Sequence, residues 1–188
     1  MNTAVLEHPP CTVRPAQPED IPVLCLLKWQ FAVGEEATFV VRASPADWMR
    51  DMFGPEPRLS ALVAEARGAV IGMAIVTKRY CAGWVGPLFA IDDLFVVPAH
   101  RGHGVGKALL TGAVRQAFER GATFIELTVR EDNHAAIRLY RQVGFERVPG
   151  ITLVLGGDAF AALACHRPAE EVADAEPGII AAGGHGLG

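Results

Sequence analysis

Runs of apolar residues bounded by turn-forming residues alternate along this chain with segments whose apolar residues recur every three or four positions. The first pattern predicts strands, and the second predicts helices that bury one face. Arg67 and Gly68 separate two of the apolar runs, which predicts a hairpin. About seven strands are predicted: Thr12–Arg14, Leu59–Ala66, Ala69–Thr77, Leu88–Val97, Phe124–Val129, Glu146–Val148 and Ile151–Leu155.

About four segments carry the start and stop signals of helices. The first begins near Pro18, which is followed by acidic residues that suit the positive end of a helix. In the second, Ser44 precedes Pro45, and Asp47 stands three residues after Ser44, an arrangement that caps a helix start. The other two are predicted over residues 105–120 and 133–143. Strands early and alternation later predict an α/β (α+β) fold with one mixed sheet flanked by helices.

A chain of 188 residues is long enough for one domain with a sizeable core and short for two. We expect a flexible leader over residues 1–11, a folded domain over 12–165 and a mobile tail of Gly, Ala, Pro and acidic residues over 166–188. The net charge is −4, and most of it falls in the tail, so no nucleic-acid partner is expected. No membrane span and no signal peptide are expected either, which predicts a cytoplasmic protein.

The cysteines and histidines show no pattern typical of a metal or redox centre. The four cysteines are widely scattered, which favours free thiols in a reducing compartment. His100 and His103 are three residues apart but lack further ligands of suitable type nearby. No metal is therefore expected in the site.

The most informative segment is Ile91–Lys107, where an apolar strand runs into a glycine-rich turn that opens a helix. Backbone N–H groups at the start of a helix attract phosphate groups. The spacing G-x-G-x-G matches neither a Walker A loop nor a dinucleotide-binding loop. Asp92 and Asp93 lie just upstream on the same strand, so one short segment offers an anion site and a possible general base.

Three motifs, taken together, resemble the GNAT superfamily of N-acetyltransferases. Arg101, Gly104 and Gly106 match the R-x-x-G-x-G pattern of the acetyl-CoA pyrophosphate loop of that superfamily. Residues 133–145 are similar to its N-x-x-A-x-x-L-Y-x-x-x-G-F helix at every signature position, and residues 13–20 resemble its opening strand and helix. The resemblance implies a twisted, mostly antiparallel sheet of about seven strands flanked by about four helices, acetyl-CoA as co-substrate and no metal.

Within the superfamily, the chain most resembles the diamine (spermidine/spermine-type) N-acetyltransferases. This branch usually carries Glu where the chain has Asp92, and it places acidic and aromatic residues where the chain has Phe31–Gly34. The resemblance implies a small diamine- or polyamine-like acceptor and a homodimer. Glu35 and Glu36 could add negative charge near that acceptor. The segments that follow the branch are residues 47–54, 62–65, 84–86 and 91–96.

The resemblance also implies the roles of particular residues. We expect Asp92 to take the proton of the acceptor amine, directly or through water, and Asp93 to cap or pair structurally, because neighbouring strand residues face opposite sides. Tyr140 is expected to protonate the leaving thiolate. The expected acetyl-CoA site comprises Phe95, Val96, Val97, Arg101, Gly102, His103, Gly104, Val105, Gly106, Lys107, Asn133, Ala136 and Tyr140.

Two other functions are compatible with the same motifs. The acceptor could be a protein lysine or N-terminus, which a wide and open acceptor groove would favour. Alternatively, the chain could be a regulatory module that binds acyl-CoA without turnover. The presence of both Asp92 and Tyr140 favours an enzyme over such a module.

Overall fold

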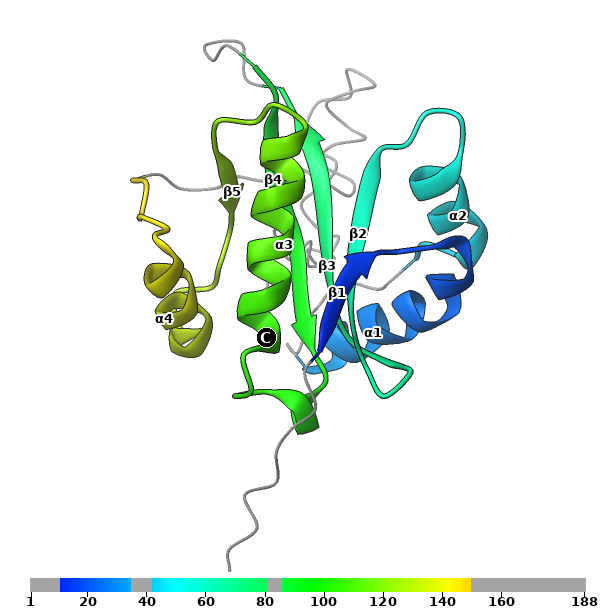
Figure 1. Ribbon diagram of the computed structural model, residues 1–188, viewed down its shortest axis with the longest axis horizontal. Coiled ribbons are helices and arrows are strands. Elements are labelled where there is room, and N and C mark those ends of the chain that lie inside the picture. Colours follow the sequence, from blue (N-terminus) through cyan, green and yellow to red (C-terminus); the bar gives the residue numbers. More distant parts are fainter. Residues whose placement is uncertain (1–10, 35–41, 81–85, 150–188) are drawn as a thin grey trace, which may run out of the picture.

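The computed structural model describes residues 11–34, 42–80 and 86–149, which form one open sheet with helices on both faces (Figure 1). The sheet has five strands in the order β1-β2-β3-β4-β5 within these residues. The first four strands are antiparallel to their neighbours, and β5 is parallel to β4. Their bounds are β1 (Thr12–Pro15), β2 (Leu59–Ala66), β3 (Ala69–Arg79), β4 (Leu88–Val96) and β5 (Ile125–Leu127).

The helices begin and end where the local sequence predicts. In α2, Asp47 N–H donates to the Ser44 hydroxyl at 3.2 Å, and Ser44 N–H donates to the Asp47 carboxylate at 2.9 Å, which completes the expected capping box. Gly144 ends α4 in the left-handed conformation, with φ 104°. The bounds are α1 (Ile21–Gly34), α2 (Pro45–Phe53), α3 (Val105–Glu119) and α4 (His134–Val143), with short 3-10 turns η1 (Pro18–Asp20) and η2 (Pro98–His100).

Each face of the sheet carries its own core. Val63, Met73 and Ile75 pack with α1 and α2 on one face. Leu62 and Val76 belong to the core that α3 and α4 complete on the other face. Because both faces are covered, the central strands are apolar on both sides, and this explains their nearly continuous apolar runs. The mixed and mostly antiparallel sheet predicted from the sequence is confirmed.

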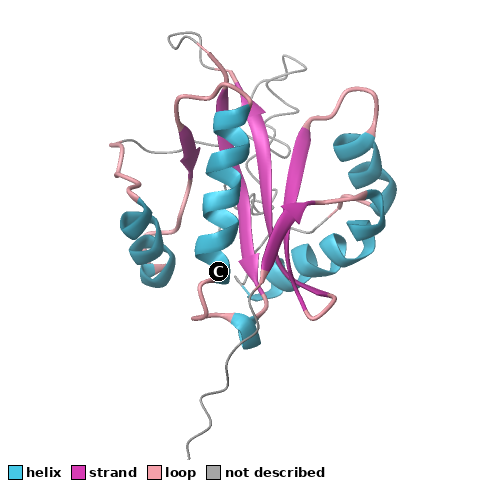
Figure 2. Cartoon of the chain, in the orientation of Figure 1, coloured by secondary structure: helices cyan, strands magenta, loops and turns pink. Residues whose placement is uncertain are grey.

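The number of strands differs from the prediction. Residues Glu146–Val148 do not form a strand, and Val148 is 83% exposed. An apolar run becomes a strand only when a neighbour completes its hydrogen-bond ladder, and no described strand lies beside this one. The predicted strand Phe124–Val129 shortens to β5, which Figure 2 shows as a brief strand beside β4 with loop on either side.

Several predictions lie outside the described residues. They are most of the leader, Glu35 and Glu36, part of the 84–86 loop, the strand Ile151–Leu155 and the tail 166–188.

Candidate active site

The strand β4 changes its register at Asp92. Ile75 lies opposite Asp93 and Val76 lies opposite Ile91, so Asp92 is the extra residue of a β-bulge. A bulge interrupts the regular alternation of side chains along a strand. The two neighbouring acids therefore project from a local irregularity of β4, just beyond the residues that pair with β5.

The two acids have different partners. Lys28 of α1 donates to both carboxylate oxygens of Asp93 at 2.7 Å, and the two side chains are only 17% and 9% exposed. Asp93 therefore pairs structurally, as expected. On the other side, Arg79 at the end of β3 donates to Asp92 Oδ1 at 3.0 Å and to Glu126 Oε1 of β5 at 3.2 Å. Arg79 thus connects the bulge of β4 to β5.

One edge of β4 is open beyond the bulge. Among the described residues, β5 pairs with β4 only at Phe89, Ala90 and Ile91. Residues Asp93–Val96 pair with β3 on their other edge. The backbone groups of this half-strand can therefore form strand-like hydrogen bonds with an extended ligand. The strand ends at Val96, before Pro98, as the sequence predicts.

The glycine-rich turn leads from this open edge to the start of α3. Gly102 and Gly104 have φ values of 77° and 82°, in the left-handed region that glycine adopts at little cost. Gly104 is the N-cap of α3, and no side chain of the described residues caps this helix. The first N–H groups of α3 are therefore left for an anion. Gly106 has a different role, because a Cβ there would come within 3.3 Å of Leu139 on α4.

Arg101 connects the turn to the open edge. Its Nε donates to the backbone oxygen of Val96 at 2.9 Å, and its guanidinium carbon lies 5.5 Å from the centre of the Phe95 ring. The side chain therefore folds back onto β4 and contacts Phe95 and Val96, two residues of the expected acetyl-CoA site.

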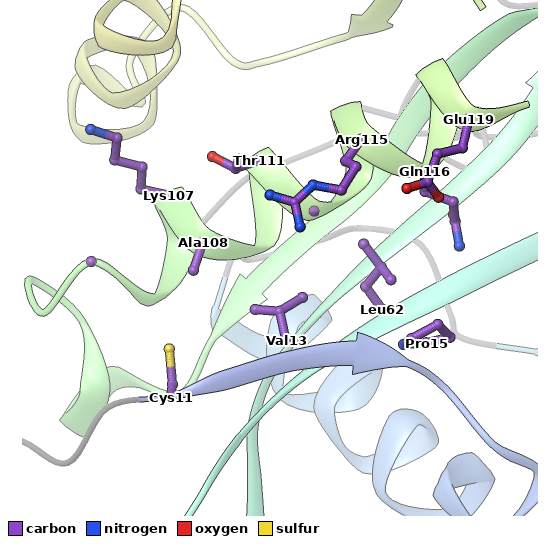
Figure 3. A pocket seen from close by; sticks show the side chains of 12 residues that line it. Cys11, Val13, Pro15, Leu62, Lys107, Ala108, Thr111, Arg115, Gln116 and Glu119 are labelled. Atoms are coloured by element: carbon purple, nitrogen blue, oxygen red, sulfur yellow. The ribbon is translucent and has the colours of Figure 1, made fainter. Parts of the chain in front are cut away.

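Lys107, further along the same segment, lies on the first turn of α3. This side chain lines a groove of about 640 Å³ between α3 and β1. Figure 3 shows Lys107 and Thr111 on the side of the groove away from Cys11 and Val13. Gly104 also lines this groove, so the groove adjoins the glycine-rich turn.

The signature residues of α4 share one face of the helix. Asn133 caps α4 by accepting a hydrogen bond from Ala136 N–H at 3.1 Å. Ala136 and Tyr140 follow on the buried face, and the Tyr140 ring packs against Phe145 with 5.8 Å between ring centres. Ala136 and Tyr140 belong to the same core, and Asn133 lies seven residues, about two helical turns, before Tyr140.

Three polar residues of the site were not predicted from the sequence: Lys28, Arg79 and Glu126. A signal existed for Lys28, which is the only charged residue in α1. A single charge in an otherwise apolar helix indicates a buried partner, because an unpaired buried charge is costly. Arg79 and Glu126 lie at strand positions where charged residues are common, so nothing local marks them.

Membrane-spanning helices and clusters of metal ligands are absent from the described residues. Among them, no helix has the length and apolar character needed to cross a membrane. They contain no group of three or more His, Cys, Asp or Glu that could hold a metal ion.

Known proteins of similar sequence include acetyltransferases. A thialysine N-epsilon-acetyltransferase of Mus musculus is 26% identical over 140 residues, which cover 70% of this chain and 82% of that relative. The N-alpha-acetyltransferase RimI of Mycobacterium tuberculosis is 34% identical over 105 residues, which cover 55% of this chain and 61% of that relative.

Solved structures share the fold at low sequence identity. The aminoglycoside N-acetyltransferase AAC(6')-Iy in complex with CoA superposes with a TM-score of 0.65 at 20% identity, covering 81% of this chain and 98% of that chain. A transcriptional regulator from Bacillus halodurans C-125 reaches a TM-score of 0.65 at 24% identity, covering 78% and 100%. The sequence profile of the Acetyltransferase (GNAT) family matches residues 26–145, which is more than half of the chain. The chain therefore belongs to the GNAT family and is an acyltransferase.

Proposed function

We propose that the protein transfers the acetyl group of acetyl-CoA to a primary amine. One observation carries the proposal: the uncapped start of α3 and the open edge of β4 lie on either side of Arg101. The Arg101 side chain, in the turn before α3, donates a hydrogen bond to the backbone oxygen of Val96 on β4. A ligand with a diphosphate and an extended arm fits such a site, because the helix start attracts the phosphates and the strand edge pairs with the arm. GNAT acetyltransferases use acetyl-CoA, which has both features.

In the proposed reaction, the amine nitrogen attacks the thioester carbonyl, a C–N bond forms and the C–S bond breaks. The amine must first be neutral, which costs about 4 kcal/mol at pH 7 for a group with a pKa near 10. Asp92 takes this proton directly or through water. Arg79 occupies one lone pair of Asp92 Oδ1, and a carboxylate has further lone pairs to accept a proton.

Tyr140 completes the reaction by giving its phenolic proton to the departing thiolate of CoA. Its place on the face of α4 that Asn133 and Ala136 share supports this role. The phenol then recovers a proton from solvent. In this scheme Asp92 on β4 removes a proton from the attacking amine, and Tyr140 on α4 gives a proton to the departing sulfur.

The acceptor is proposed to be an amine on a small molecule. The mouse relative, whose name specifies the N-epsilon amine of thialysine, matches over more of its length than the relative named an N-alpha-acetyltransferase. The diamine- or polyamine-like character of the acceptor, the homodimer and the cytoplasmic location remain predictions from the sequence.

Two measurements test the proposed function. Calorimetry should detect binding of CoA and acetyl-CoA to the purified chain, and a thiol reagent should detect CoA release when amines are added. The absence of any heat with either ligand would overturn the proposal. Binding of acetyl-CoA without release for every amine would instead support the regulatory module.

The acid role has its own test in Tyr140→Phe. This variant should lower turnover by about 10²-fold or more while leaving the affinity for acetyl-CoA nearly unchanged. Equal turnover of variant and wild type, with chemistry shown to be rate-limiting, would remove Tyr140 from the mechanism.

A further inference from the structure

A second pocket lies between the last turns of α1 and the end of β4, with a volume of about 360 Å³. Phe95 and Val97 line it from β4 and the residue that follows, while Trp29, Phe31 and Val33 line it from α1. Phe95 and Val97 belong to the segment whose backbone is proposed to bind the pantetheine arm. The pocket therefore lies beside the proposed path of the acetyl donor, where an acceptor can approach.

Most of the described residues that line this pocket are aromatic or aliphatic. The rings of Phe31 and Phe95 meet edge to face with 6.0 Å between their centres. Trp29 and Val33 are 58% and 59% exposed, so their apolar surfaces are available to a ligand. Burying an apolar group of a ligand here would gain about 25 cal/mol per Å² removed from water.

The described residues that line the pocket do not suit a molecule with several positive charges. Arg101 is the only charged residue among the described residues that line it. Asp93 does not line the pocket and is paired with Lys28, whose Nζ lies 5.2 Å from the centre of the Phe31 ring. A second ammonium group on the acceptor would meet an apolar wall and a guanidinium, and both disfavour it.

One polar atom of the same region has no hydrogen bond. Gln30 lines the pocket, and its Oε1 is buried without a hydrogen-bond partner in the part of the chain that the structure describes. Buried oxygens of this kind normally accept a hydrogen bond. Because this oxygen is closed to solvent, a ligand in the pocket would not reach it without a change of the Gln30 side chain.

We propose that the acceptor is a primary amine with one positive charge and an apolar, preferably aromatic, substituent that this pocket holds. This inference rests on the proposed acetyl transfer and narrows it. It departs from the diamine- or polyamine-like acceptor that the sequence resemblance implies, because it excludes diamines and polyamines as the preferred acceptors. It follows from the ion pair between Lys28 and Asp93 and from the apolar residues that line the pocket. The sequence resemblance alone reveals neither feature.

The test compares amines in the CoA-release assay with the full chain. The probes are 2-phenylethylamine and hexylamine on one side, and 1,4-diaminobutane and spermidine on the other. We expect kcat/KM to be at least about tenfold higher for the first two, in the range that apolar pocket contacts confer. A higher kcat/KM for the diamine or for spermidine would overturn the inference and leave the proposed acetyl transfer intact.

Substitutions in α1 connect the preference to the pocket. Val33→Glu places a negative charge on the pocket wall and should lower kcat/KM for 2-phenylethylamine and raise it for 1,4-diaminobutane. Leu26→Glu is the matched control, because Leu26 is 51% exposed on the same helix and does not line the pocket. The control should keep the wild-type preference. If Val33→Glu and Leu26→Glu changed the preference between the two amines equally, the assignment of this pocket as the acceptor site would be overturned.

The acidic residues Glu35 and Glu36 follow Gly34 directly in the sequence. The double variant Glu35→Gln/Glu36→Gln should keep the preference for 2-phenylethylamine. If the double variant lost that preference, the conclusion that the pocket causes the preference would be overturned. Failure of every amine to release CoA would instead refute the acetyl transfer on which the inference depends.

Discussion

The ion pair between Lys28 and Asp93 makes a sharp prediction about stability. Both contacts measure 2.7 Å, and the side chains are 17% and 9% exposed, so the pair is largely removed from water. Lys28→Met keeps the length of the apolar stem but removes the ammonium group. The Asp93 carboxylate is then buried without its compensating charge.

The expected loss is large because the charge that remains cannot reach water. Removing one partner of a buried ion pair typically costs about 3–5 kcal/mol. For a domain of this size, each kcal/mol lowers Tm by about 2–4 °C, so the variant should melt roughly 6–20 °C below wild type. Thermal unfolding followed by circular dichroism near pH 7 measures the shift.

Two further variants make the result specific. Lys28→Met combined with Asp93→Asn removes both charges and should recover most of the lost stability, because no charge remains buried. Arg147→Ala breaks an ion pair whose side chains are 79% and 87% exposed, and it should leave Tm nearly unchanged. A Tm for Lys28→Met close to wild type, or a double variant as unstable as the single one, would refute the reasoning.

Three other predictions follow from the site and its surroundings. Asp92→Asn should lose activity near neutral pH and regain it where the acceptor amine is already neutral, and an unaltered pH profile of kcat/KM would point to another base. Gly104→Ala forces a left-handed residue at a cost of about 1–2 kcal/mol, so the KM for acetyl-CoA should rise about 5- to 30-fold. Gly68→Ala, with φ 75° in the β2–β3 turn, is its control and should leave that KM unchanged. The hydrogen bonds from Arg14 hold the pKa of Asp20 below its usual value, so Asp20 stabilises the fold above about pH 4 and this contribution is lost as the pH falls further. Asp20→Asn should therefore lower Tm at pH 7, and the difference from wild type should shrink in acid; a constant difference would contradict the linkage.

Local sequence was enough to predict the features whose interactions span only a few residues. The capping box of Ser44 and Asp47, the hairpin at Arg67 and Gly68, and the cap at Asn133 all involve partners close in sequence. The order of these signals also indicated the mixed sheet, because strand and helix periods depend on neighbouring residues. The short segment at Glu146–Val148 shows the limit of this reasoning: its composition suits a strand, but a strand also needs a partner.

The charges of the site were decided by the tertiary structure. Asp92 and Asp93 are identical neighbours in the sequence, and the sequence resemblance alone suggested which one acts as the base. Folding brings Lys28 to Asp93 across 65 positions and Arg79 to Asp92 across 13 positions. It also places a largely apolar pocket between α1 and β4, with Arg101 as the charged residue among the described residues that line it. Coulomb interactions depend on distance in space, which sequence separation does not determine.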